Sequence, residues 1–219
     1  MSREVKLITN FHDYYDHHFD GSGMPFLRKH DMGMNRPQML DYLSSKGIKT
    51  VPYGHLHEMA KKYPLHAEVV VYTDISKHQG EGKIRMSLIE ALETYPIDTF
   101  CTLFCGNLGE SWRVLNVGRR KTILDYRSKN DWRSNVGDVE ITIIDCWSRM
   151  PSFEGILDPY EFPLVAIDYV KDGKELLAVD LNVAPQLKGT GMEDIVTPEK
   201  VVNEMKKYIG RGAMKHGVR

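Results

Sequence analysis

Apolar and polar positions change their period along the chain, and the period predicts where helices and strands lie. Residues 35–45 place Met39, Leu40 and Leu43 on one face of a helix. Asn35 can cap that helix at its amino end. Further helices are expected over residues 55–62, 84–93 and 197–209.

Short runs rich in β-branched and aromatic residues predict strands. Residues 68–72 have the pattern of a buried strand, and the other candidates, separated by turn residues, are 99–104, 112–117, 122–126 and 139–144. Residues 162–170 and 175–182 flank Lys171-Asp172-Gly173-Lys174, a strong hairpin signal. A small α/β portion followed by a mainly antiparallel sheet and a C-terminal helix indicates an α+β protein.

Composition and charge narrow the class of protein. The chain has 219 residues, 42% of them hydrophobic, and a formal net charge of −1. This is typical of one folded domain with two lobes, or of two small domains, and gives no support for binding nucleic acid or an anionic membrane surface. No apolar run approaches the ~20 residues that span a bilayer, and none follows the N-terminus as in a secretory signal. With three cysteines, the chain is expected to be cytoplasmic and without a disulfide framework.

The hairpin over residues 162–182 carries carboxylates and an amide within apolar strands. Asp180 and Asn182 are two residues apart and share a face, whereas the face of Asp168 depends on the turn. A two-residue turn would point Asp168 to the other face, and a three-residue loop closed by Gly173 in a G1 bulge would bring the three oxygens together. Such a set suits Mg²⁺. The alternative is that the acids form salt bridges or cap strand ends.

Several arginines precede this hairpin. Arg113 and Arg127 lie in strand candidates, and Arg133 lies with Asn135 in a polar turn. Guanidinium groups aimed at one cleft bind phosphate oxygens through paired hydrogen bonds. The alternative is that each arginine is solvated or paired with a nearby acid.

Together these segments resemble the ATP-grasp superfamily, especially its carboxylate–amine ligases that elongate peptides or modify protein C-termini. The family shows an arginine with a valine-rich strand and glycine, then an arginine before an (F/W)RSN turn. It continues with an Asp, an acid-x-Asn, a proline and a glycine. In this sequence the motifs are Arg113-Val114-Leu115-Asn116-Val117-Gly118, Arg127, Trp132-Arg133-Ser134-Asn135, Asp168, Asp180-Leu181-Asn182, Pro185 and Gly189.

The resemblance implies an ATP-grasp-like fold and assigns roles to these residues. The expected parts are a shortened N-terminal segment (1–45), a small α/β nucleotide lobe (46–98), a larger, mainly antiparallel lobe with a C-terminal helix (99–210) and a flexible tail (211–219). ATP would bind with one or two Mg²⁺ held by Asp168, Asp180 and Asn182. Arg113 and Arg127 would neutralise the transferring phosphoryl group, and Arg133 and Asn135 would bind the acyl phosphate or its carboxylate precursor.

The upstream part resembles the family more loosely. Gly80-Glu81-Gly82 is similar to its flexible loop over the phosphates, and residues 99–105 to the strand that meets adenine, which brings Phe104 to the nucleotide. The family's strand-ending lysine, in a "VVKP" pattern, is absent, and Lys77 or Lys83 is the candidate in its place. Only about 35 residues precede the first helix, so the acceptor site is expected to be reduced, supplied by another subunit, or lost.

The implied function is an ATP- and Mg-dependent ligase that activates a carboxylate as an acyl phosphate and joins it to an amine. Its partners would be a small-molecule or peptide carboxylate and an amine acceptor, with homo-oligomerisation left open. One alternative is a non-catalytic nucleotide-binding descendant of the fold, favoured by the missing lysine. The other is a metal-dependent hydrolase that would use a cluster of histidines and aspartates: His12, Asp13, Asp16, His17 and His18. These residue types are good transition-metal ligands, but they do not have the spacing typical of a zinc site.

Overall fold

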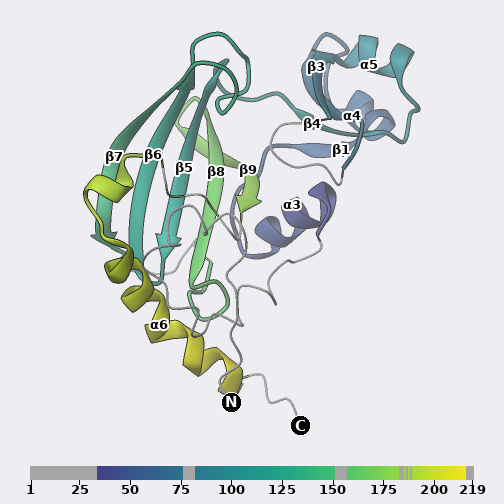
Figure 1. The fold of residues 1–219 in the computed structure, drawn as a ribbon. Helices are drawn as coiled ribbons and strands as arrows, with labels where there is room; N and C mark the ends of the chain where they lie inside the picture. The colour runs from purple at the N-terminus through teal and green to yellow at the C-terminus, as the bar shows by residue number, and fades with distance from the viewer. Residues whose placement is uncertain are drawn as a thin grey trace.

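The computed structural model describes residues 34–75, 82–150, 157–182, 185, 187 and 189–215, which contain two antiparallel sheets (Figure 1). The small sheet has the strand order β1-β4-β2-β3, and the large sheet has the order β7-β6-β5-β8-β9. The strands are β1 (Tyr53–His55), β2 (Glu68–Tyr72), β3 (Lys83–Ser87), β4 (Phe100–Leu103), β5 (Glu110–Val117), β6 (Arg120–Ser128), β7 (Val139–Arg149), β8 (Leu164–Asp172) and β9 (Glu175–Asn182). The helices are α3 (Arg36–Ser45), α4 (Leu56–Lys62), α5 (Leu88–Thr94), the 3-10 helix η1 (Met192–Asp194) and α6 (Pro198–Lys215).

Helix α3 forms where the sequence predicts it and connects the two sheets. A capping box closes its amino end: the Asn35 side chain accepts from the Gln38 N–H, and the Gln38 side chain accepts from the Asn35 N–H, each at 3.0 Å. Met39 and Leu40 pack into the core of the small sheet, whereas Leu43 packs into that of the large sheet. In Figure 1, α3 accordingly lies between them, beside β9.

The small sheet contains a strand that was not predicted, β1, and differs from its prediction again at residues 84–87. A helix was expected over residues 84–93 because Ile84, Leu88, Ile89 and Leu92 suggest an apolar face, but its first part is strand β3. Ile84 pairs with Val71 in the β2–β3 ladder and is 39% exposed. Helix α5 begins only after Ser87, which forms a capping box with Glu90.

The large sheet buries both faces over part of its area. Leu115 and Val117 of β5 pack with Val201 and Met205 of α6 on one face. On the other face, Val165 and its neighbours pack with Leu43 of α3 and with Leu157 and Phe162. Helix α6 begins at Pro198 as predicted but continues to Lys215, beyond the expected end near residue 209. No described helix is long and apolar enough to cross a membrane.

The β8–β9 hairpin positions its acids in an unexpected way. Asp172 pairs with Glu175, so the turn consists of two residues, 173 and 174, and the predicted three-residue loop is wrong. This turn alone would put Asp168 opposite Val179. A register shift between Asp168 and Tyr169 leaves Val179 as the extra residue of a bulge, and Asp168 pairs with Asp180 instead. Asp168, Asp180 and Asn182 therefore share one face of the sheet, as the metal interpretation required, but for a different reason.

Candidate functional site

A cleft of about 480 Å³ lies between the two sheets. The small sheet contributes Tyr72 and Lys83 to its wall, the large sheet contributes its paired acids, and the turn after β6 closes one side. The cleft brings together most of the residues proposed from the sequence: Lys83, Phe104, Arg113, Arg133, Asn135, Asp168, Asp180 and Asn182.

Three further residues belong to the predicted nucleotide lysine and glycine loop. Lys77 and Gly80 lie outside the described residues, as does the histidine-rich segment 11–20. Gly82 immediately precedes β3 and is not part of the cleft wall; its carbonyl accepts from the Thr73 N–H at 2.9 Å.

Arg127 does not join Arg113, although the sequence assigned both to one phosphoryl group. Arg113 pairs with Leu124 in the β5–β6 ladder, and Arg127 lies three residues further along β6, so its side chain projects from the opposite face. There it is 55% exposed and paired with Asp125 and Glu110. It lines a separate hollow of about 330 Å³.

Part of the cleft wall is apolar. Val51, Val70, Val170 and Val179 line it together with Phe104. The Phe104 ring meets the Trp132 ring edge to face, with centroids 6.1 Å apart, and the Arg85 guanidinium lies 4.6 Å from its centroid. These contacts fix a flat aromatic surface beside the charged end of the cleft.

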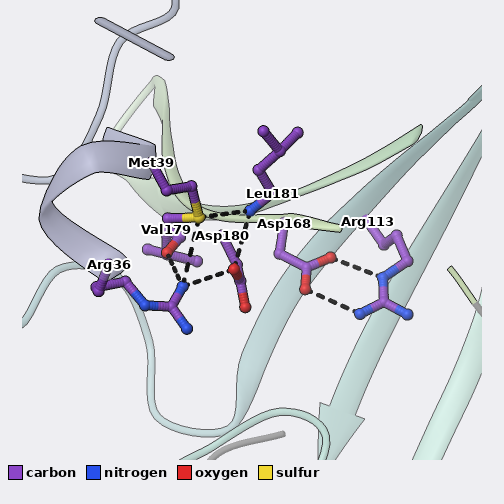
Figure 2. Close-up of polar contacts among 7 residues, drawn as sticks. All are labelled: Arg36, Met39, Arg113, Asp168, Val179, Asp180 and Leu181. Carbon is purple, nitrogen blue, oxygen red and sulfur yellow. Dashed lines mark hydrogen bonds and ion pairs between the residues drawn. The ribbon is translucent and has the colours of Figure 1, made fainter. Parts of the chain in front are cut away.

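Asp168 is bound by Arg113 through both carboxylate oxygens. Arg113 Nε donates to Oδ1 at 2.7 Å and Nη2 donates to Oδ2 at 2.9 Å (Figure 2). Burial disfavours the charged guanidinium, but the Asp168 carboxylate outweighs it, so the pKa of Arg113 is raised above its ordinary value. The Arg113 guanidinium also lies over the Tyr126 ring, 5.1 Å from the centroid.

Asp180 has its own arginine, Arg36, which comes from the first turn of α3 (Figure 2). Arg36 Nη1 lies 2.6 Å from Asp180 Oδ1 and donates to the Val179 carbonyl at 3.1 Å. Asp180 Oδ1 also accepts from the Leu181 N–H at 2.9 Å. Burial raises the pKa of Asp180, but Arg36 and Lys83 together lower it below its ordinary value.

Sequence reasoning missed Arg36. It lies at the amino end of a helix, where the helix dipole disfavours a cation. Its side chain is only 3% exposed, so it requires an anionic partner. An arginine directly after a capping residue was the signal that could have identified it.

Lys83 is the lysine that the small sheet brings to the cleft. Its ammonium lies 5.7 Å from the centroid of the Tyr72 ring, its neighbour in the β2–β3 ladder. Burial lowers the pKa of Lys83, and the nearby positive charge of Arg36 lowers it further. Within the described part of the chain, no carboxylate forms an ion pair with this ammonium.

The turn after β6 is held rigidly at the rim of the cleft. Arg133 binds Asp131 through two hydrogen bonds: Nε donates to Oδ1 at 2.9 Å, and Nη2 donates to Oδ2 at 2.8 Å. The hydrogen bond from Arg133 lowers the pKa of Asp131 to about 2. The hydroxyls of Ser134 and Ser111 lie 2.5 Å apart and tie the turn to β5.

The oxygen donors of Asp168, Asp180 and Asn182 suit a hard cation such as Mg²⁺ in their chemistry. Among the described residues, no three His, Cys, Asp or Glu side chains gather as a metal cluster, and this set contains only two acids beside the amide. Arg113 occupies both oxygens of Asp168, whereas Asp180 Oδ2 has no hydrogen-bond partner in the described part of the chain. The set therefore fits a cation that takes most of its ligands from elsewhere, such as phosphates.

Solved structures with the same arrangement identify the fold. D-alanine–D-alanine ligase from Bacillus anthracis superposes with a TM-score of 0.56 at 13% identity, over 84% of this chain and 69% of that chain. The ATP-grasp ligase PsnB, complexed with a phosphomimetic variant of its minimal precursor, Mg and ADP, superposes with a TM-score of 0.54 at 10% identity. The chain has the ATP-grasp fold.

The ATP-grasp-like fold and the α+β class predicted from the sequence are thus confirmed. N5-carboxyaminoimidazole ribonucleotide synthetase from Thermus thermophilus gives a TM-score of 0.51 at 13% identity, over 84% of this chain and 53% of that one. The match to PsnB covers 80% of this chain and 59% of PsnB. No protein-family model and no curated protein match the sequence.

Proposed function

We propose that this protein is an ATP-dependent ligase that activates a carboxylate as an acyl phosphate and joins it to an amine. The observation that carries the proposal is the position of Arg113, Asp168, Asp180 and Asn182 on one face, across the cleft from Lys83. The solved structures with this fold named above include two ligases.

The two ends of the cleft suit the two ends of a nucleotide. The apolar end, with Phe104 and the surrounding valines, provides a surface for a planar base. The charged end offers Lys83 and Arg113 to phosphate oxygens. Asp180 and Asn182 would hold Mg²⁺ there, and the ion would neutralise charge on the phosphates.

The carboxylate substrate fits the rim formed by the turn after β6. Arg133, Asn135 and the Ser111–Ser134 hydroxyl pair present hydrogen-bond donors to the cleft. Because Asp131 fixes the Arg133 guanidinium, these donors are preorganised. Preorganised donors lower the barrier to phosphoryl and acyl transfer mainly by positioning and charge stabilisation.

The test is ADP release in a screen of acid and amine pairs with Mg²⁺, with mass spectrometry of the joined product. Asp180→Ala should abolish release, whereas Asp138→Ala, at an exposed carboxylate paired with Lys129, should leave it unchanged. Asp180→Asn keeps the side-chain volume and limits the stability lost when Arg36 is left without an anion. Undiminished turnover in both Asp180 variants, with folding verified by circular dichroism, would refute the proposal.

A second candidate is a nucleotide-binding protein without catalysis. The ion pairs of Asp168 with Arg113 and of Asp180 with Arg36 favour it, because they engage carboxylates that a metal would use. Nucleotide binding with no ADP release, across a broad panel of carboxylates and amines, would support this candidate over the ligase.

A further inference from the structure

Most charged groups at the charged end of the cleft are already paired within the protein before any ligand binds. Asp168 and Asp180 on the cleft wall, and Asp131 beside Arg133, are each paired with an arginine. Lys83 adds a fourth cation that no described carboxylate matches by an ion pair. The pairs are Arg36–Asp180, Arg113–Asp168 and Arg133–Asp131. The remaining carboxylate on the cleft wall, Glu110, is paired with Arg127, which projects from the opposite face of the sheet and also pairs with Asp125.

Arg36 is fixed in this arrangement. Its side chain is 3% exposed, and its Nη1 contacts three groups: the Asp180 carboxylate, the Val179 carbonyl and, at 3.7 Å, the Met39 sulfur (Figure 2). Its guanidinium also lies 5.6 Å from the centroid of the Tyr72 ring. Arg36 lies on the capped first turn of α3, which packs against both sheets. It cannot move into solvent without disrupting that packing.

This arrangement opposes a free divalent cation. A metal approaching Asp180 meets an arginine already paired with the same carboxylate, and Asp168 offers no unoccupied oxygen. Mg²⁺ dehydrates reluctantly and is usually bound through one or two carboxylates together with substrate phosphates. A polyphosphate, by contrast, meets the Lys83 ammonium, which no described carboxylate pairs with, and guanidinium donors beside it.

We propose that the cleft binds the polyphosphate of a nucleotide without a divalent cation, and that it takes up the cation only together with the polyphosphate. The inference rests on the proposed function, since it concerns the same site. Arg36 is then the residue that sets this order, because it neutralises Asp180 from within the protein.

The experiment measures ADP binding by calorimetry in excess EDTA and in Mg²⁺, and Mn²⁺ binding by electron paramagnetic resonance with and without ADP. We expect the ADP dissociation constant in EDTA to lie within about tenfold of its value in Mg²⁺. Mn²⁺ should remain free at millimolar concentration until ADP is added.

Arg36→Met removes the internal cation while keeping an apolar side chain of similar length. This variant should bind Mn²⁺ without ADP and should lose about tenfold or more in metal-free ADP affinity. Lys61→Met, at an exposed position on α4, is the matched control and should change neither property. If Arg36→Met does not fold, Lys83→Met tests the ammonium that no described carboxylate pairs with: the substitution should weaken metal-free ADP binding more than binding with Mg²⁺.

The outcomes separate this inference from the proposed function. ADP binding that requires Mg²⁺, or Mn²⁺ binding to the ligand-free wild-type protein, overturns the inference and leaves the ligase proposal standing. Failure of ADP to bind in either condition overturns both.

Discussion

Asp168 lies opposite Asp180 in the β8–β9 ladder only because Val179 is an extra residue on β9. The two-residue turn would otherwise set Asp168 against Val179 and direct the two carboxylates to opposite faces. The bulge thus determines the geometry of the site. Changing the length of β9 by one residue tests this role of the bulge.

Single-residue deletions on β9 should have unequal effects. Deleting Val179 removes the bulge and still leaves Asp180 opposite Asp168, whereas deleting Leu181 moves Asn182 to the other face. We expect the gain in ADP affinity on adding Mg²⁺ to survive the first deletion and to be lost in the second, because Asn182 is a proposed ligand of the cation. Calorimetry with ADP, on variants shown to be folded, compares them; equal loss would contradict the role given to the register.

Removing one partner of the Arg113–Asp168 pair should destabilise the protein more than removing both charges. Arg113→Met leaves the Asp168 carboxylate, which is 18% exposed, without its partner and should lower the free energy of unfolding by about 3 kcal/mol. The double variant Arg113→Met/Asp168→Asn should recover most of that loss. Urea denaturation of both variants measures the difference, and an equally unstable double variant would argue against a charge effect.

Two glycines with similar backbone angles should differ in their tolerance of alanine. Gly118 has φ +54, and a Cβ there would lie 2.4 Å from Tyr208 Cε2 on α6; Gly173 has φ +60 and open space around it. Gly173→Ala should cost about 1 kcal/mol for the left-handed backbone alone. Gly118→Ala should cost about 3 kcal/mol because crowding adds to the same strain. Thermal and urea unfolding of both variants check this ordering.

The buried thiols should be slow to react in the native protein. Burial raises the pKa of Cys101 to about 12 and that of Cys105 to about 11. The thiolate is the reactive form, so at pH 8 both should react far more slowly with iodoacetamide than the half-buried Cys146. Peptide mapping by mass spectrometry gives the order, and denaturant should remove the differences.

The Asp131–Arg133 pair predicts a dependence of stability on acid pH. Hydrogen bonding to Arg133 lowers the pKa of Asp131 from 3.8 to about 2. The stabilisation is therefore fully present above pH 4 and is lost as the pH falls through 2. Asp131→Asn should flatten this part of the stability curve, measured by urea unfolding between pH 2 and 6. Its effect will be modest because the pair is partly exposed.

Elements with local signals were predictable from the sequence. The helix at Asn35 has its capping residue and apolar stripe, and β2 and β9 were predicted with the bounds that the structure shows. The prediction for residues 84–87 was wrong because Ile84, Leu88 and Leu92 recur at helical spacing and resembled an amphipathic face. The local cue that was overlooked is Ser87 with Glu90, which marks the true start of α5.

Features that depend on tertiary packing were not predictable in the same way. The bulge at Val179 and the separation of Arg127 from Arg113 follow from strand register, which turn residues alone did not specify. The pairing of Arg36 with Asp180 joins positions 144 apart in the sequence. The residues at the charged end of the cleft were predicted because they match a family pattern, and Arg36 was not part of that pattern.

The ion pair between Arg36 and Asp180 also has an evolutionary consequence. Loss of either charge alone leaves the other charge unpaired inside the protein. The residues at the two positions should therefore be substituted together rather than one at a time. Descendants of this chain that have abandoned an acid at position 180 should therefore carry an uncharged residue at position 36.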